Sequence, residues 1–197
     1  MYLAGVCDRN GVIDGRLAAR SPRVRPSERT HDYVLWGNGD EAIAITQNDV
    51  RAIQLAKAAL RAGIDLLLER ADAPPPDSIA LAGAFGAHID PVRATVLGLV
   101  PDAPPGAIES VGNAAGTGAV EALLSRRLRS EMEAAVRGVT KVETATEPRF
   151  QELFVAAMAL PHATAPTPHL ATQVALPEAD SDPEPRRRRR RGPRDDR

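Results

Sequence analysis

The sequence predicts an α/β fold in which a mixed sheet is covered by helices, and three features of the 197-residue chain indicate it. Two segments, 78–82 and 107–111, each combine a short apolar strand with a following glycine turn and a helix. A long amphipathic helix is predicted at about residues 47–70, and a β-hairpin precedes it. Strands that alternate with helices along the chain are typical of layered α/β proteins.

The N-terminal part of the chain is predicted to contain loops and one hairpin. Asp8-Arg9-Asn10-Gly11 is a strong turn signal, and residues 15–30, rich in Arg, Ser and Pro, are expected to form an exposed loop. Segments 32–36 and 41–45 flank a glycine turn and are predicted to pair as a β-hairpin. The first residues read as the end of an element whose beginning is missing, so we expect a fold truncated at its N-terminus.

The long helix has a clear start and a regular apolar stripe. Thr46-Gln47-Asn48-Asp49 resembles a capping box, with Asp in the fourth place. Apolar side chains recur at helical spacing and predict a buried face, namely Val50, Ile53, Leu60, Ile64 and Leu67. Lys57 occupies a gap in this stripe, where a lysine must reach water, a partner or a ligand.

The second half of the chain is predicted to continue the α/β pattern and then to lose it. After the strand at 78–82, Asp90-Pro91 is expected to start a helix that ends near Leu99. After the strand at 107–111, a helix with a break is expected to reach about residue 137, followed by an edge strand at 139–145 and a helix from Pro148. Periodicity stops at Pro161, so we expect one domain at 1–161 and a disordered Pro/Arg-rich tail at 162–197.

Composition excludes several classes of function. The 25 basic and 26 acidic residues give a net charge of −1, which does not favour nucleic acid or anionic lipid as a partner of the whole chain. The run Arg186–Arg191 is the exception, although a solvated tail is favoured for it. The lone Cys7 excludes an internal disulfide and a cysteine-based metal or iron–sulfur site, and the histidines lack metal-ligand spacing. No signal peptide or membrane-length apolar run is present, so we expect a cytoplasmic protein.

The two glycine turns are the candidate binding features. Gly83-Ala84-Phe85-Gly86 and Gly112-Asn113-Ala114-Ala115-Gly116-Thr117-Gly118 follow predicted strands and precede or begin helices. The end of a strand in an α/β sheet is a usual ligand position, and the N–H groups at a helix start favour anions. The second turn matches neither a P-loop nor a dinucleotide fingerprint. Tight packing of helix on strand is the competing interpretation.

Four segments of the chain together resemble the C-terminal region of the reductive activators of corrinoid proteins. They are ITQNDVRAIQLAKAALRAGIDLLLE (45–69), IALAGAFGAHIDPVRATVLGLVPD (79–102), IESVGNAAGTGAVEALLS (108–125) and TATEPRFQELFVAAMALP (144–161). These activators belong to the superfamily of acetate and sugar kinases, heat-shock chaperones and actin. The resemblance implies an actin-like (ribonuclease H-like) half-domain that binds ATP.

The resemblance also implies roles for ten residues. The adenosine and ribose would be lined by Gly83, Ala84 and Gly86. The second connecting motif, which packs a helix at the domain hinge, would comprise Gly112, Asn113, Gly116 and Gly118. The purine would be bracketed by Gln54, Lys57 and Arg61, which share one helix face. A solvated face is the favoured alternative for Gln54 and Arg61, and a stem that snorkels to water is an equal alternative for Lys57.

The resemblance implies a function that this chain would share with other polypeptide. Family members use ATP to drive electron transfer from a two-iron cluster, in an N-terminal ferredoxin-like domain, to a corrinoid iron–sulfur or methyltransferase protein. The ferredoxin domain and the phosphate- and magnesium-handling half are not in this sequence, so we expect no catalytic residue here and no activity alone. The expected partners are the corrinoid protein and the missing half, and self-association is open. The alternative is a non-catalytic protein-binding module with the arginine tail as its docking element.

Overall fold

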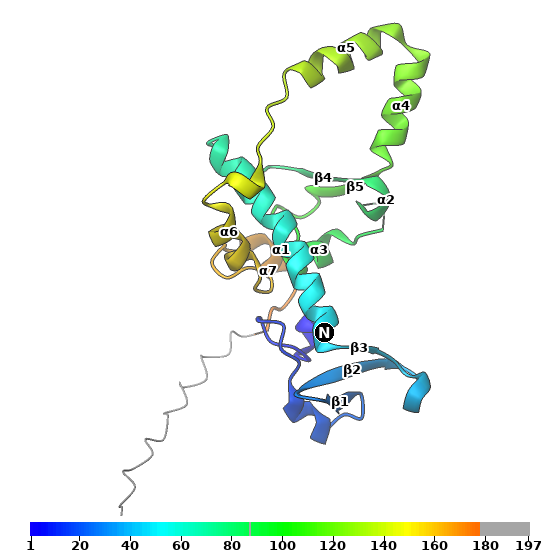
Figure 1. Cartoon of the computed structure of the whole chain (residues 1–197), viewed down its shortest axis with the longest axis vertical. Helices are drawn as coiled ribbons and strands as arrows, with labels where there is room; N and C mark the ends of the chain where they lie inside the picture. Colours follow the sequence, from blue (N-terminus) through cyan, green and yellow to red (C-terminus); the bar gives the residue numbers. More distant parts are fainter. Residues whose placement is uncertain (87, 178–197) are drawn as a thin grey trace, which may run out of the picture.

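The computed structural model describes residues 1–86 and 88–177, which form two sheets and seven α-helices (Figure 1). The strands are β1 (Val24–Ser27), β2 (Thr30–Trp36), β3 (Ile43–Ile45), β4 (Ile79–Ala82) and β5 (Ile108–Gly112). The helices are α1 (Gln47–Arg70), α2 (Gly83–Gly86), α3 (Pro91–Leu97), α4 (Ala114–Leu124), α5 (Arg126–Arg137), α6 (Phe150–Ala157) and α7 (Pro168–Gln173). Short 3-10 turns are η1 (Tyr2–Ala4), η2 (Gly15–Ala19), η3 (Gly39–Glu41) and η4 (Thr144–Thr146). The predicted α/β class is confirmed.

Strand pairing differs in part from the expected arrangement. β1, β2 and β3 form an antiparallel sheet, which confirms the hairpin, while β4 and β5 form a separate parallel pair. Within the described residues, the two kinds of pairing therefore lie in different sheets rather than in one mixed sheet. The loop expected at 15–30 is wrong, because it contains η2 and β1, and Val24 is buried opposite Tyr33. The edge strand expected at 139–145 is also wrong, because that stretch has no strand and η4 begins at Thr144.

Helix α1 starts where the sequence predicts, but it buries a different face. The Thr46 hydroxyl accepts a hydrogen bond from the Asp49 amide (3.1 Å), and the Asp49 carboxylate accepts one from the Thr46 amide (2.8 Å), so the capping box is confirmed. The expected buried stripe is largely wrong beyond Val50, since Ile53, Leu60 and Leu67 are each about half exposed, at 48, 50 and 54%. The buried face of α1 instead includes the polar side chains of Gln54, Lys57 and Arg61.

The main apolar core joins the two ends of the described chain. Its buried members come from the N-terminal segment, β1, α1 and the segment after α6, namely Val6, Cys7, Ile13, Val24, Val50 and Leu160. Helix α1 runs from the antiparallel sheet past the parallel pair, and α6 packs along it (Figure 1). This packing ties the C-terminal segment to the N-terminal half.

The folded part extends beyond the expected boundary at residue 161. His162 is buried, and the side chain of Leu170 in α7 is 0% exposed. The carboxylate of Asp102 accepts hydrogen bonds from the amides of His169 (2.8 Å) and Leu170 (2.9 Å), which fixes the start of α7. The expected disorder is therefore wrong for residues 162–173. Residues 178–197, including Arg186–Arg191, lie outside the described part.

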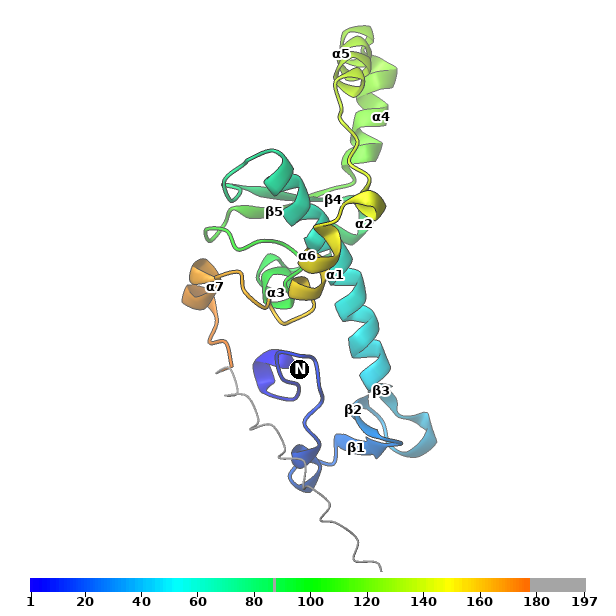
Figure 2. The same ribbon diagram turned by 60° about the vertical axis from the view of Figure 1, so that its left-hand side comes forward.

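Helices α4 and α5 project from the rest of the chain in both views (Figures 1 and 2). They correspond to the expected helix with a break, and the break falls at Ser125. Among the described residues, no helix is both long enough and apolar enough to cross a bilayer.

Candidate nucleotide site

The two glycine turns lie side by side at the carboxyl edge of the parallel strands. Ala82, the last residue of β4, pairs in parallel register with Gly112, the last residue of β5. Gly83 follows Ala82 directly, so β4 and β5 both end at this edge of the sheet, where α2 and α4 begin (Figure 1). This edge is the usual ligand position in α/β sheets.

Gly83 and Gly112, the two corner glycines, have open space beside their Cα atoms. Their φ angles are +93° for Gly83 and +64° for Gly112, in the region that favours glycine. A Cβ built on either residue would meet no atom of the described residues within 4 Å, its two chain neighbours aside. Packing of the described chain therefore does not account for these glycines, and a ligand has room to lie against the backbone.

The remaining residues of the two turns have local structural roles. A Cβ on Gly86 would lie 2.6 Å from the Leu81 carbonyl oxygen, so this glycine lets α2 lie close to β4. The Asn113 side chain caps α4 by accepting a hydrogen bond from the Gly116 amide at 3.0 Å. Gly118 faces Met132 of α5, and Ala84 lies within α2. For all of these positions nucleotide contact stays a prediction, and the structure shows a packing or capping role for Gly86, Asn113 and Gly116.

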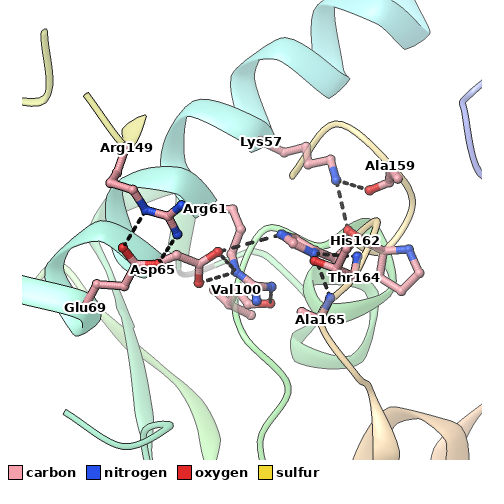
Figure 3. Close-up of polar contacts among 11 residues, drawn as sticks. Lys57, Arg61, Asp65, Glu69, Val100, Arg149, Ala159, His162, Thr164 and Ala165 are labelled. Atoms are coloured by element: carbon pink, nitrogen blue, oxygen red, sulfur yellow. Dashed lines mark hydrogen bonds and ion pairs between the residues drawn. The ribbon is translucent and has the colours of Figure 1, made fainter. Parts of the chain in front are cut away.

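The polar side chains of α1 point toward other parts of the backbone (Figure 3). The Lys57 ammonium donates hydrogen bonds to the carbonyl oxygens of Ala159 (2.5 Å) and Pro161 (3.0 Å). The Arg61 guanidinium pairs with Asp65 at 2.8 Å and donates to the Val100 carbonyl at 3.1 Å. These side chains donate hydrogen bonds to backbone carbonyls that would otherwise be buried without partners. This explains why α1 buries its polar face.

Gln54 completes this set one turn earlier. Its amide nitrogen donates to the carbonyl oxygens of Asn10 (3.1 Å) and Met158 (2.9 Å), so it joins the N-terminal turn to the C-terminal segment. Its Oε1 is buried without a hydrogen-bond partner in the described part of the chain. The expected solvated or snorkelling positions are wrong, since Gln54, Lys57 and Arg61 are 1, 1 and 6% exposed.

The structure therefore brings together one half of the expected site. Gly83 and Gly112 meet at one edge, whereas the polar atoms of Gln54, Lys57 and Arg61 are engaged with backbone and Asp65 elsewhere. Contact of these three side chains with a purine stays a prediction.

Burial lowers the pKa of two groups in this cluster. Loss of water, and then the charge of Arg61, lowers the pKa of Lys57 to about 8. Burial is also the largest cause that lowers the pKa of His162, and it outweighs the opposing charge of Asp65, whose Oδ2 is 3.8 Å from Nε2. Both shifts favour the neutral form.

The hydrogen bonds of His162 also fix its tautomer. Its Nδ1 accepts hydrogen bonds from the amides of Thr164 (3.2 Å) and Ala165 (2.9 Å), so the proton of the neutral ring sits on Nε2 (Figure 3). The sequence did not indicate His162, because this residue falls in the segment expected to be a disordered tail. Its two hydrogen-bond donors are backbone amides, which almost any residue type provides. No three His, Cys, Asp or Glu side chains lie close enough to hold a metal ion in residues 1–86 and 88–177.

Comparisons with known proteins bear on the family and the fold of the chain. Residues 1–171 match the family model described as the C-terminal domain of RACo, the ASKHA domain. The chain is 44% identical over 133 residues to the corrinoid activation enzyme RamQ of Eubacterium limosum, and the match covers 66% of this chain and 22% of that protein. It also matches the solved structure of a reductive activator for a corrinoid, iron–sulfur protein with a TM-score of 0.71 and 34% identity. That match covers 82% of this chain and 26% of the other.

The chain thus spans about a quarter of the length of the two relatives. The family match, by contrast, takes in nearly all of the described residues, including α7 up to Ala171. Fold and sequence lead to one assignment. The chain belongs to the family formed by the C-terminal, actin-like ASKHA domain of the corrinoid activator RACo.

Proposed function

We propose that this chain is the nucleotide-binding C-terminal portion of an ATP-dependent reductive activator of corrinoid proteins. The observation that carries the proposal is the meeting of Gly83 and Gly112 at one strand edge, each with open space where a side chain would stand. The adenosine of ATP lies against these two corners.

In this proposal the polar side chains of α1 are positioning residues. Lys57 and Gln54 hold segment 158–161 against the helix, and Arg61 holds the loop at Val100 after α3. They keep the half-domain in shape, and any contact with the purine is additional.

The proposed activity needs more polypeptide than this chain. The chain matches 22% of RamQ and 26% of the solved activator, so the iron–sulfur cluster, the magnesium ion and the phosphate-handling groups are assigned to the remainder. The chain supplies nucleoside contacts, which position ATP without activating water. We therefore expect no ATP hydrolysis by the chain alone, and a corrinoid protein as the partner of the complete activator.

Calorimetric titration of the full chain with ATP tests the proposal. Gly83→Val and Gly112→Val each place a side chain where the nucleoside would lie, and we expect each to weaken binding at least about tenfold. Gly106→Val is the matched control, because Gly106 has a φ of +82° and equally open surroundings but lies before β5, away from the corners. It carries the same backbone strain and should bind ATP like the parent chain.

Two results would contradict the proposal. One is equal loss of binding in all three glycine variants, which would indicate a general effect of strain. The other is the absence of heat with ATP at millimolar concentration, which would favour the protein-binding module. That second candidate is supported by the half-exposed apolar stripe of α1, at Ile53, Leu60 and Leu67.

A further inference from the structure

A small basic pocket lies beside the antiparallel sheet, between the segment that leads into β1 and the end of β2. It has a volume of about 290 Å³, and its lining includes Arg23, Arg25, Leu35, Trp36 and Asn38. This volume is just below the roughly 300–1,000 Å³ that is usual for small-molecule sites. The pocket therefore suits one or two side chains of a polypeptide rather than a cofactor.

The two arginines of this pocket have no acidic partner in residues 1–86 and 88–177. Arg23 donates hydrogen bonds to two carbonyl oxygens at the end of β2 (3.1 and 2.7 Å), which hold its guanidinium in place. Arg25 donates to the Asn38 side chain at 3.4 Å and forms no ion pair with Asp32, which lies opposite it in the strand register. Residues 15–38 hold five arginines and two acidic residues, although the whole chain has a net charge of −1. Guanidinium groups without a carboxylate partner favour an anionic ligand.

Trp36 gives the pocket an aromatic wall. It is the chain's one tryptophan, and it is 69% exposed. Tryptophan and arginine together are typical of the residues that anchor polypeptide contacts. Proline-containing segments dock on such aromatic surfaces because they are already extended before they bind. The pocket thus matches a segment that combines carboxylates with prolines.

The chain contains a segment of this kind directly after its described part. Residues 178–185 read EADSDPEP, with four acidic residues, two prolines and no basic residue. The described part ends at Pro177, beside the N-terminal segment that leads through η2 into β1 in both views (Figures 1 and 2). Seven further residues, fully extended, reach roughly 25 Å from Pro177. The acidic residues are therefore tethered close to the part of the molecule that carries the pocket.

We propose that the acidic segment 178–185 binds this pocket of its own chain, with a carboxylate on Arg25 and a proline ring on Trp36. Tethering gives the segment an effective concentration of roughly millimolar, so weak contacts suffice, and an acidic segment on a separate polypeptide lacks this advantage. The run Arg186–Arg191 that follows is repelled by the pocket, so the acidic stretch alone fits it. The bound segment covers Trp36 and closes the pocket to other acidic ligands. The proposal is independent of nucleotide binding.

Quenching of Trp36 fluorescence by acrylamide tests the proposal, because the one tryptophan lies in the pocket and acrylamide is uncharged. The comparison is between the full chain and a full-length variant with a neutral segment, which carries Glu178→Gln, Asp180→Asn, Asp182→Asn and Glu184→Gln. We expect Trp36 to be protected in the parent chain and to lose this protection in the variant. Salt at 1 M should remove the protection in the parent as well, since the screening length falls to about 3 Å.

Peptides added to the neutral-segment variant identify the contacts. The peptide EADSDPEP should restore the protection of Trp36, whereas QANSNPQP, of the same length and without charge, should not. Arg25→Gln in this variant should weaken the charged peptide at least about fivefold, because a charge-assisted pair is lost. Arg51→Gln is the matched control, since Arg51 is exposed on α1 away from the pocket, and it should leave the affinity unchanged. Circular dichroism checks that each variant is folded.

Three results would overturn the proposal. Equal quenching in the parent and the neutral-segment variant would show that the segment does not cover Trp36. Restoration by the peptide that does not depend on Arg25 would show that the contact lies elsewhere. Protection in the parent that grows with protein concentration would show that the segment of another molecule, rather than the chain's own, fills the pocket.

Discussion

The Leu170 side chain is fully buried in α7, within a segment whose sequence reads as disordered tail. Leu170→Ala removes buried methyl groups and leaves a cavity, a change that costs about 2–5 kcal/mol in protein cores. We expect about 3 kcal/mol, because the amides of His169 and Leu170 keep their hydrogen bonds to Asp102 in the variant. For a chain of this size, that corresponds to a fall in Tm of roughly 6–12 °C.

Urea denaturation followed by far-ultraviolet circular dichroism measures this difference. Leu67→Ala is the matched control, since it is the same substitution at a side chain that is 54% exposed on α1. The control should change the free energy of unfolding by less than about 0.5 kcal/mol. Equal, small effects of the two substitutions would show that α7 does not pack on the domain, and the reasoning about where the folded part ends would fail.

Three further outcomes are expected from the α1 cluster and its start. The pKa of Lys57 is lowered from 10.5 to about 8, so between pH 8 and 10.5 the unfolded chain binds more protons than the folded one. The free energy of unfolding should therefore rise with pH by up to about 3 kcal/mol across that window. Urea titrations measure the rise, and Lys57→Met should abolish it. Burial lowers the pKa of His162 below 6.5, so the neutral ring contributes fully to stability above pH 6.5, and this contribution is lost as pH falls toward the folded-state pKa. In thermal melts, His162→Gln should reduce the fall of Tm with decreasing pH. The same dependence of Tm on pH in the variant would contradict the buried neutral ring. Thr46→Ala breaks the capping box and should cost about 1 kcal/mol of unfolding free energy, whereas Thr30→Ala, on an exposed strand residue, should cost less.

Features encoded locally could be predicted from the sequence. The start of α1 follows from Thr46 and Asp49, which are three residues apart and bond to each other. The strands β4 and β5 follow from short apolar runs that end at glycines, and the start of α3 follows from Asp90 and the proline after it. Each of these signals lies within a few residues of the structure that it specifies.

The buried face of α1 could not be predicted in this way. Lys57 and Gln54 donate to carbonyl groups that lie 102 and 104 residues away in the sequence. Periodicity registers which residues are apolar, but it does not register where a returning segment places unpaired carbonyls. The apolar stripe therefore predicts a buried face, although Ile53, Leu60 and Leu67 are each about half exposed.

Long-range partners explain the other differences. β1 exists because Val24 and its neighbours pair with β2, which overrides a composition typical of loops. α7 is fixed by Asp102, which lies 67 residues before His169. In the site, the glycine turns were evident from the sequence, but their meeting depends on the parallel register of Ala82 with Gly112.

Titration of the isotope-labelled full chain with ATP, followed by amide chemical shifts in NMR spectra, tests the central claim most directly. The amides of Gly83 and Gly112 should shift together and saturate with one dissociation constant, while Gly106, with similar backbone geometry outside the edge, should not move. Shifts that gather elsewhere in the chain and leave Gly83 and Gly112 unchanged would contradict the claim that this strand edge holds the nucleoside.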